Sequence, residues 1–564
     1  MSQIFQWVQK PNPDKAVVQK LISEINVSSP IATILAQRGI TNYNEAKSFF
    51  NPSINDIHDP FLMKNMHKAV DLIENTLRNN QNILIYGDYD VDGTTAVSLM
   101  YLYLKNFTSQ ISYYLPDRYA EGYGISEKGI QFAIDNNISL IISLDCGIKA
   151  NETIAFAKEN NIQFIVCDHH TPGEILPPAD AILNPKQADC NYPYKELSGC
   201  GVGFKLIQAF NQKQGNLITE VLPYLDLVVV SIAADIVPIT GENRVLAHFG
   251  LEILNNNPRT GLAILLETVN HPIDISKIVF GIAPKINAAG RVKHANHSID
   301  LLTCKAHEKA KEFLTEINQL NGTRRDFDAQ TTEEALNQIK QNNEENDYST
   351  VVYKENWHLG VVGIVASRLI SNYYRPTLVF TKNGEMLTAS ARSTSNFDLY
   401  EALQNFEHLF IKFGGHKFAA GLSLSEENYP VFKKQFELYA KNNIPETDRL
   451  PSLEIDCELD LSQLSSSFFT VLNRLSPFGP QNLNPVFLSS KVSLTDCNFI
   501  GLERNHLRCK VKPQNSNALF QAIYFNCLDK IDIESKNEWD IVYSIEENHW
   551  QNTKTLQLII KDIR

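Results

Sequence analysis

Residues 162–170 read IQFIVCDHH, a largely apolar run that ends in Asp168, His169 and His170. A short apolar run of this kind is typical of a buried strand in a parallel sheet. Carboxylate and imidazole are both ligands for divalent transition metals. The stretch therefore predicts an α/β fold in which one strand delivers three side chains capable of binding metal.

Three further apolar runs also end in carboxylates. The runs are QNILIY (81–86), followed by Asp88, Asp90 and Asp92; SLIISL (139–144), followed by Asp145; and LDLVVVSIAA (225–234), followed by Asp235. We expect all four runs to be strands of one open parallel sheet, where ligands bind beyond the carboxyl ends of the strands. Six carboxylates and two histidines would then meet at one edge. Such a cluster of like charges requires a cation to neutralise it.

The acidic segment after the first run has its own pattern. Asp88, Asp90 and Asp92 alternate, so an extended chain would place them on one side, and Gly93 permits a tight turn into a helix over 94–107. The first six positions also match a calcium-binding EF-hand loop. That interpretation fails because the twelfth position is Leu99 and not glutamate. An exposed acidic turn remains the alternative for this segment alone.

The other candidates also have simpler interpretations when taken singly. Asp145 and Asp235 could each cap a helix or turn, and His169-His170 could be a solvated pair. Their shared position at the ends of predicted strands favours a metal site over these alternatives. Mn²⁺ and Mg²⁺ prefer carboxylate oxygens, and imidazole shifts the preference toward Mn²⁺.

The ligand set is large enough for two cations. Two ions about 3.5–4 Å apart would clamp a phosphodiester, one activating water and the other stabilising the leaving oxygen. We expect Asp145 to bridge them and His170 to bind or protonate a phosphate oxygen. The expected sets are Asp88, Asp90 and Asp145 for one ion, and Asp92, Asp145, His169 and Asp235 for the other.

The bulk composition is that of an ordinary globular protein. The 564 residues suggest three or four domains, and 43% are hydrophobic and 20% charged. A net charge of −13 argues against a uniformly basic nucleic-acid coat but allows a local basic groove. The nine scattered cysteines form no CxxC pair, so neither a structural zinc site nor a disulfide framework is expected. The N-terminus lacks a signal-peptide pattern, and no apolar run approaches the ~18 residues of a membrane span. We therefore expect a cytoplasmic protein with no membrane partner.

Changes of pattern divide the chain into five expected parts. They are a helical segment (1–55), an α/β domain with a parallel sheet (56–300), a connecting part with a long helix over 305–341 (301–347), a second α/β domain (348–445) and, after a polar linker, a small β-barrel (452–564). The barrel is expected because five or six short alternating strands follow one another, beginning with 453–459.

Specific motifs along the chain resemble the DHH superfamily of phosphoesterases and, within it, the RecJ family of bacterial single-strand-specific 5′→3′ DNA exonucleases. The motifs are GDYDVDG (87–93), LDCGI (144–148), CDHH (167–170), SGCGVGFKL (198–206), SIAADIVP (231–238), PKINAAGRV (284–292), WHLGVVGIVASRL (357–369), SARSTSNFDLYEAL (390–403), FGGHKFAAG (413–421) and PFGPQNLNPVF (477–487). The resemblance extends over roughly residues 30 to 564. It implies a DHH domain, a DHHA1 domain and a terminal OB-fold.

The resemblance also implies roles for individual residues. The metal ligands would be Asp90, Asp92, Asp145, His169 and Asp235, with catalytic roles for Asp88, Asp168, His170 and His416. His416, in a GGH loop, would close over the scissile phosphate from the second domain. Nucleic-acid phosphates near the 5′ end would be held by Arg118, Arg291, Ser390, Arg392, Gly414 and Gly415. Arginine suits bidentate phosphate binding and glycine allows close approach of the backbone, although any single arginine could instead form a surface ion pair.

An OB-fold usually binds single strands with basic and aromatic side chains. The aromatic candidates are Phe478, Phe487, Phe520 and Tyr524, each of which could instead belong to the barrel core. The segment PFGPQNLNP departs from the family pattern by having Gln481 where glycine is expected, which questions the turn geometry there.

The expected activity is processive, metal-dependent 5′→3′ hydrolysis of single-stranded DNA to 5′-mononucleotides, in DNA repair and recombination, with two Mn²⁺ or Mg²⁺ ions. The chain contains no GxxxxGK[ST] motif, so ATP is not expected as a cofactor. We expect a monomer that works with a helicase and a single-strand-binding protein. One alternative is a nanoRNA or nucleotide phosphatase of the same superfamily, which would lack the terminal barrel. The other is a catalytically silent DNA-binding scaffold, which would lack metal ligands.

Overall fold

The computed structural model describes residues 5–514, 516–527, 535–550 and 553–564. It separates into two compact units. We call the first the parallel-sheet unit, made of Lys47–Thr323 and Arg474–Leu483. The second, the barrel unit, comprises the described residues of Met1–Ala46, Arg324–Asn473 and Asn484–Arg564. Each unit is described by itself below.

The first unit is organised by a sheet of five parallel strands. In spatial order the strands are β3 (Ile111–Tyr114), β2 (Asn82–Gly87), β4 (Ile138–Leu144), β5 (Gln163–Cys167) and β6 (Ala181–Leu183). After β2 the chain forms β3 on one side and then returns to form β4 on the other. The order of the strands therefore reverses between β2 and β4, which is where open α/β sheets bind ligands.

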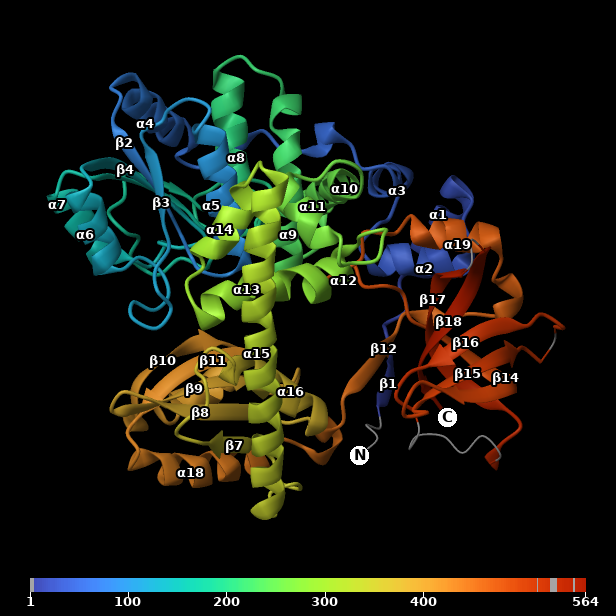
Figure 1. Cartoon of the computed structure of the whole chain (residues 1–564). Coiled ribbons are helices and arrows are strands. Elements are labelled where there is room, and N and C mark those ends of the chain that lie inside the picture. The colour runs from blue at the N-terminus through green and yellow to red at the C-terminus, as the bar shows by residue number, and fades with distance from the viewer. Residues whose placement is uncertain (1–4, 515, 528–534, 551–552) are drawn as a thin grey trace. The chain divides into compact units, whose positions relative to one another are not determined.

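Helices cover both faces of this sheet (Figure 1). One face packs against α6 (Glu127–Asp135) and α7 (Asn151–Glu159). The other packs against α4 (Met66–Arg78), α5 (Val91–Leu104) and α8 (Gly199–Lys213). Because both faces are covered, the strands are apolar throughout and not only at alternate positions.

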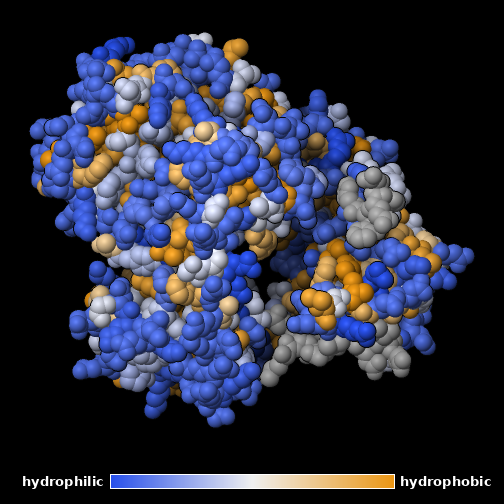
Figure 2. Space-filling model, in the orientation of Figure 1, coloured by the Kyte–Doolittle hydropathy of each residue, from blue (hydrophilic) through white to orange (hydrophobic). Residues whose placement is uncertain are grey.

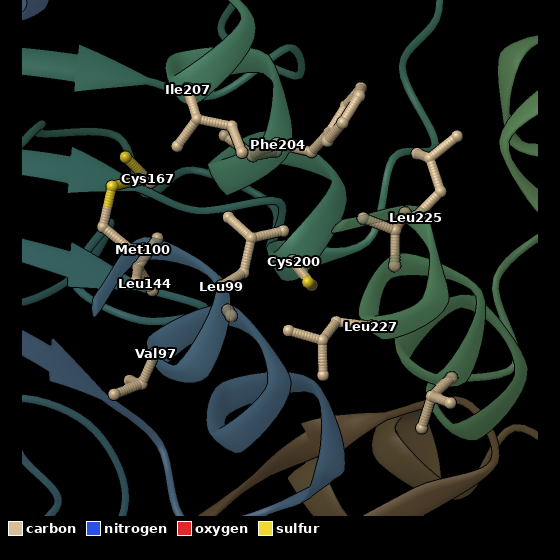
Figure 3. Close-up of a cluster of buried hydrophobic side chains, with 14 of the residues drawn as sticks. Val97, Leu99, Met100, Leu144, Cys167, Cys200, Phe204, Ile207, Leu225 and Leu227 are labelled. Carbon is tan, nitrogen blue, oxygen red and sulfur yellow. The ribbon is translucent and has the colours of Figure 1, made fainter. Parts of the chain in front are cut away.

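A third layer of helices lies behind α5 and α8. Figure 3 shows Leu99 of α5, Phe204 of α8 and Leu227 of α9 (Leu225–Ala234) within one cluster of buried side chains, and all three are fully buried. Complete burial of a side chain of this size contributes roughly 1.5–3 kcal/mol. This core supports the ends of the strands and helices that carry the acidic residues.

The expectation of a strand over 225–234 is wrong, because this segment is helix α9. A fully buried segment is apolar on all sides whether it is a helix or a strand, so periodicity does not separate the two. Ten consecutive apolar-rich residues are longer than a usual buried strand, and length was the signal that favoured a helix.

The rest of the parallel-sheet unit is helical. Its helices are α10 (Gly241–Asn256), α11 (Thr260–Leu266), α12 (Ile275–Lys277), a π-helical turn (Ile278–Ile282), α13 (Ala283–Val292) and α14 (Asn296–Thr303). The predicted long helix is present as α15 (His307–Gln341), and the chain passes from one unit to the other within it.

The barrel unit contains a mixed five-stranded sheet in the order β10 (Phe410–His416), β11 (Ala419–Leu424), β9 (Met386–Arg392), β8 (Thr377–Asn383) and β7 (Thr350–Tyr353). Helix α16 (Val362–Asn372) covers one face of this sheet, while α17 (Leu399–Gln404) and α18 (Asn428–Asn443) cover the other. The unit therefore contains the predicted second α/β fold.

The predicted β-barrel is also present. Its closed circuit consists of β14 (Phe487–Ile500), β15 (His506–Lys512), β16 (Phe520–Tyr524), β18 (Thr553–Ile563) and β17 (Trp539–Trp550), which pairs back onto β14. The expected strand over 453–459 is split in two. Its second part is β13 (Cys457–Glu458), which pairs with β14, while β12 (Ser452–Ile455) pairs with the N-terminal strand β1 (Gln6–Gln9).

The N-terminal helices α1 (Lys15–Ile25), α2 (Ser29–Gln37) and α3 (Tyr43–Phe50), and α19 (Ser466–Asn473) before the barrel, complete the helices. The face seen in Figure 2 is mostly hydrophilic. Among the residues that the structure describes, no helix is both long and apolar enough to cross a membrane. All nine cysteines are free thiols.

Candidate metal centre

Three neighbouring strands deliver acidic residues to one edge of the parallel sheet. Asp88 follows β2, Asp145 follows β4, and Asp168-His169 follows β5, in the spatial order β2-β4-β5. Asp88, Asp145 and His169 are all buried. The edge of the sheet therefore carries carboxylates and an imidazole that are withdrawn from bulk water.

The acidic segment after β2 enters α5 earlier than the sequence indicated. Asp90 is the N-cap of α5, where its side chain accepts a hydrogen bond from the Gly93 backbone N–H at 3.0 Å, and Asp92 lies in the first helical turn. The expectation that three aspartates share one side of an extended chain is therefore wrong. The helix starts directly against the strand end, since a Cβ on Gly93 would lie 2.3 Å from the Asp88 carbonyl oxygen.

Asp92 is fixed by the start of α8. Its carboxylate accepts hydrogen bonds from the backbone N–H groups of Gly199 and Cys200, both at 2.7 Å, and from Ser231 Oγ at 2.6 Å. Backbone N–H groups at a helix N-terminus favour a negative charge. Asp92 is thus held in a fixed orientation.

Asp145 has a left-handed backbone, with φ of 61°. Aspartate is one of the few residues that tolerate this conformation. The Asp145 backbone N–H donates to the Cys167 carbonyl oxygen at 2.9 Å, and Tyr123 Oη donates to the Asp145 carbonyl oxygen at 3.0 Å. The resulting turn directs Asp145 toward β5.

Asp235 joins the cluster from the C-cap of α9 and not from a strand. His169 Nε2 lies 3.6 Å from Asp235 Oδ2, 3.8 Å from Asp92 Oδ2 and 3.2 Å from Asp145 Oδ1. The end of the buried helix therefore reaches the same edge that a strand would have reached.

The ligand atoms form three groups in which all atoms lie within 4.8 Å of one another. The groups are Asp88, Asp90 and Asp145; Asp92, His169 and Asp235; and Asp145, His169 and His170. The first two groups coincide with the ligand sets expected from the sequence, apart from the bridging role of Asp145. The contact between Asp145 and His169 places Asp145 beside both sets.

The electrostatics of these groups fit two divalent cations. Burial, followed by repulsion from neighbouring carboxylates, raises the pKa values of Asp88, Asp145 and Asp235 well above their usual range. The pKa of Asp90 is raised for the same reasons. Asp88 Oδ1 and His169 Nε2 are buried without a hydrogen-bond partner among the described residues. Buried polar atoms normally have partners, and a cation would provide one here.

Asp168 and His170 form a pair beside these groups. Asp168 accepts hydrogen bonds from the backbone N–H groups of Ile148 (2.9 Å), His169 (2.7 Å) and His170 (3.1 Å), and its Oδ1 lies 2.7 Å from His170 Nδ1. Burial alone would raise the pKa of Asp168, but the hydrogen bond to His170 and the backbone donors outweigh it and lower the pKa to about 2. Asp168 therefore orients His170, and it belongs to none of the three ligand groups found in the part of the chain that the structure describes.

Sequence reasoning missed three residues around the cluster. Tyr123 Oη lies 3.4 Å from both ring nitrogens of His170, Asn184 Nδ2 donates to the His170 carbonyl oxygen at 2.9 Å, and Ser231 binds Asp92. The glycines on either side of Tyr123 both have positive φ. A Gly-Tyr-Gly sequence was thus the one available signal for an ordered turn here.

Two of the predicted arginines lie beside Tyr89, which separates Asp88 from Asp90. Arg118 Cζ is 5.0 Å from the centre of the Tyr89 ring. Burial raises the pKa of Tyr89 to about 12, and the charges of Arg118 and Arg291 oppose this rise. Both arginines therefore place positive charge close to the acidic segment.

The other predicted residues meet in the barrel unit. Ser390 and Arg392 of β9 lie opposite Gly421 and Ala419 of β11, which lie opposite Gly414 and His416 of β10. Residues opposite one another, and residues two apart, share a face. Ser390, Arg392, Gly414 and His416 therefore share one face.

This face is the one beside α16, since a Cβ on Gly363 would lie 2.9 Å from Ser390 Oγ. The expectation of a GGH loop is wrong, because these residues are the end of strand β10. A side chain at position 415 would lie on the opposite face of the sheet. The φ of Gly415 is 154°, and a Cβ there would lie 2.4 Å from the Ala419 carbonyl oxygen, so this glycine permits close pairing of the two strands.

Two of the four aromatic candidates are core residues. Phe487 and Tyr524 are buried inside the barrel, while Phe520 is half-buried and Phe478 lies in the parallel-sheet unit. The outward positions of β15 are instead basic: His506, Arg508, Lys510 and Lys512 alternate with buried residues.

Comparisons with known proteins agree with this geometry. Three family descriptions match: "DHH family, N-terminal domain" over residues 82–232, "DHHA1 domain" over 346–442 and "RecJ OB domain" over 455–562. The single-stranded-DNA-specific exonuclease RecJ of Bacillus subtilis is 36% identical over 99% of this chain and 70% of its own length. The protein of the same name from Haemophilus influenzae is 33% identical over 89% of this chain and 91% of its own.

Solved structures agree as well. The crystal structure of RecJ from Thermus thermophilus in complex with Mn²⁺ has a TM-score of 0.86 at 26% identity, covering 99% of this chain and 79% of that one. A structure of exonuclease RecJ bound to manganese has a TM-score of 0.60 at 31% identity, covering 68% of this chain and 96% of that one.

Proposed function

This chain belongs to the RecJ family of single-stranded-DNA-specific exonucleases, and we propose that it removes nucleotides from the 5′ end of single-stranded DNA by means of the carboxylate–histidine cluster described above. It is a hydrolase that acts on single-stranded DNA with Mn²⁺ or Mg²⁺ as cofactor. The observation that carries the proposal is the convergence of Asp88, Asp145 and His169 at the edge of one parallel sheet, with buried ligand atoms that have no other partner among the described residues.

We assign the ligands to two cations. Asp88, Asp90 and Asp145 would hold one, and Asp92, His169 and Asp235, with Asp145 shared, would hold the other. When bound, the cations supply Lewis-acid stabilisation of a phosphodiester attacked by water. The backbone donors from α8 keep Asp92 in place for this role.

His170 is the residue we assign to the phosphate. Asp168 holds its Nδ1, and this pairing raises the pKa of His170 although burial opposes the rise. The protonated ring can then donate from Nε2 to a phosphate oxygen. Asp168 is a positioning residue in this scheme, which modifies the direct catalytic role expected for it.

Two sets of residues would bind the rest of the substrate. Arg118 and Arg291 both bring positive charge to Tyr89, next to the acidic segment, and would contact phosphates there. Ser390, Arg392, Gly414 and His416, gathered on one face beside the start of α16, would hold the phosphate at the 5′ end. Arginine and a helix N-terminus are both suited to binding a phosphate group.

The barrel would extend the grip on the strand. The basic outward side of β15 offers charge for the phosphate backbone, although Lys510 also pairs with Asp496 at 2.7 Å. OB-folds that bind single strands without sequence preference do so with basic and aromatic side chains. We propose that this contact makes the exonuclease processive.

We further propose that the protein releases 5′-mononucleotides, works as a monomer in the cytoplasm in DNA repair and recombination, and depends on a helicase and a single-strand-binding protein to expose its substrate. Strand separation needs such partners because the sequence has no P-loop motif for ATP hydrolysis. Free thiols at all nine cysteines suit a reducing compartment.

One experiment tests the proposal. Long single strands labelled at the 5′ or the 3′ end, and a dinucleotide, are digested with Mn²⁺ or Mg²⁺ beside an Asp145→Asn variant. We expect mononucleotide release from the 5′ label first, and none with the variant. Equal attack at 3′ ends contradicts the polarity, and preference for the dinucleotide indicates a nanoRNA phosphatase. Full activity of the variant excludes the proposed metal site.

A further inference from the structure

The segment Arg474–Leu483 leaves the barrel unit in the chain and returns to it, but it folds as part of the parallel-sheet unit. Within it, Gly479 and Asn482 exchange backbone hydrogen bonds of 3.0 and 2.9 Å, and Gln481 has φ of 59°. The left-handed conformation explains why glycine is expected at position 481. Asn482 Nδ2 closes the turn by donating to the carbonyl oxygens of Leu475 (2.9 Å) and Pro477 (2.7 Å).

Arg244 of α10 holds this segment by its backbone carbonyls. Its guanidinium donates to the carbonyl oxygens of Ser476 at 2.7 Å and Leu475 at 2.9 Å, and more weakly to those of Arg474 and Pro477, both at 3.4 Å. The side chain is buried, and its Cζ lies 3.8 Å from the centre of the Phe49 ring. Only arginine has five donors in a planar fork, so lysine cannot replace these bonds.

The segment also contacts the turn that carries Asp235. The Ile239 backbone N–H donates to the Pro480 carbonyl oxygen at 2.8 Å, and a Cβ on Gly479 would lie 2.5 Å from Ile239 Cγ1. Asp235–Thr240 is the whole connection between α9 and α10. A displacement of Ile239 in so short a connection is transmitted to Asp235.

The same turn contains an unfavourable backbone conformation. Ile236, the residue after Asp235, has φ of 58° although its side chain is β-branched, and it is 64% exposed. Such a conformation persists only where the surrounding structure holds it. Within the described residues, Asp235 has no set of backbone donors like the one that fixes Asp92 at the start of α8. Its position therefore depends on the backbone of the turn.

We propose that Arg244 and the 474–483 segment are positioning elements for the metal ligand Asp235. Arg244 holds the segment, the segment holds Ile239, and Ile239 fixes the turn in which Asp235 points toward His169. The inference rests on the proposed metal site, which it deepens by making the affinity for the second cation depend on a segment that lies far downstream in the sequence, at 474–483. A segment that only tied the two units together would affect stability and leave metal affinity unchanged.

The test is a Mn²⁺ titration of the full chain, in which free Mn²⁺ is followed by electron paramagnetic resonance. For Arg244→Lys we expect one of the two binding steps to lose about tenfold in affinity, as is usual when support of a metal ligand is removed. The Mn²⁺ affinity of the site formed by Asp88, Asp90 and Asp145 should change less, because the 235–240 turn supplies none of these ligands. Excess Mn²⁺ should restore exonuclease activity.

Gly479→Ala is the second variant, since its added methyl group displaces Ile239 without removing any hydrogen-bonding group. Arg259→Lys is the matched control. Arg259 is also largely buried and binds Asp226 at the other end of α9, at 2.6 Å, so its loss affects stability without touching the 235–240 turn. Circular dichroism during heating reports the folding of each variant.

A tenfold loss of Mn²⁺ affinity in Arg244→Lys and Gly479→Ala, with no change in Arg259→Lys, supports the inference. Unchanged affinity in the two folded variants overturns it and leaves the proposed exonuclease intact. A wild-type protein that binds two Mn²⁺ ions but does not degrade single strands overturns the proposed function alone. Equal losses in all three variants indicate general destabilisation and also overturn the inference.

Discussion

Asp145 Oδ1 and His169 Nε2 face each other at 3.2 Å, although they follow different strands of the sheet. Neighbouring parallel strands β4 and β5 end side by side, and the left-handed turn at Asp145 directs its carboxylate across to β5. This pair joins the two ligand groups, so a change at Asp145 should affect both cations at once.

Asp145→Asn should abolish exonuclease activity without loss of fold. Asparagine tolerates the left-handed conformation of this residue and preserves its volume. Even residues that only support a metal ligand contribute 10–100-fold, so we expect a loss of more than about 100-fold in kcat. The measurement is the release of labelled nucleotide from single strands at saturating substrate, and a loss below tenfold would contradict the bridging role.

Mn²⁺ should stabilise the folded protein against heat, and Asp145→Asn should remove this effect. A ligand that binds only the folded state at 100 times its dissociation constant stabilises it by about 2.7 kcal/mol. Without metal, Asp145→Asn should be more stable to heat than the wild type, because the variant removes one carboxylate from a buried group of like charges. Differential scanning fluorimetry with EDTA and with Mn²⁺ measures both effects. A metal-free variant less stable than the wild type would argue against repulsion in the cluster.

The proposed phosphate-binding face in the barrel unit can be tested at a glycine. A Cβ on Gly363 would lie 2.9 Å from Ser390 Oγ and 3.2 Å from Arg392 Nη2. Gly363→Ala should therefore displace both groups and raise KM for 5′-phosphorylated strands roughly tenfold, the equivalent of one weakened charge-assisted hydrogen bond. The value of kcat should change little.

Gly322→Ala in α15 is the control for this substitution. It is also a helical glycine, and a Cβ there would meet no described atom within 4 Å. We expect this change to leave KM unchanged and to stabilise the helix by about 0.5–1 kcal/mol. If both variants raise KM equally, the effect does not come from Ser390 and Arg392.

The sequence predicted the parallel sheet and most of the cluster because strand ends in such a sheet have only one place to converge. Asp235 was placed correctly for an incorrect reason. It ends a buried helix and not a strand, and here that helix brings its last turn to the same edge as the strand ends.

What the sequence did not reveal depends on contacts between distant segments. Tyr123 and Asn184 act on His170 through hydrogen bonds. The Gly-Tyr-Gly pattern indicates only an ordered turn at Tyr123, and no local pattern marks Asn184. Arg244 had no recognisable role until the carbonyls of 474–477 were seen around it. Hydrophobic periodicity reports which face of an element is buried, and it carries no information on which distant backbone atoms a buried polar side chain will meet.

The buried ion pair of Lys205 and Glu242 should contribute to stability and not to catalysis. Both side chains are fully buried, with Nζ and Oε1 2.9 Å apart. Glu242 also accepts hydrogen bonds from Tyr192 Oη at 2.6 Å and from the His58 backbone N–H at 3.1 Å.

Lys205→Met leaves the carboxylate buried without its cation, which should cost about 3–5 kcal/mol in the free energy of unfolding. Lys205→Met combined with Glu242→Gln removes both charges and keeps an acceptor for Tyr192, so it should cost less than the single change. Urea unfolding measures the free energy of unfolding of the wild type, of Lys205→Met and of the double variant. The Mn²⁺ affinity should be the same in every folded variant. A double variant less stable than Lys205→Met would show that the glutamate charge is compensated by groups other than Lys205.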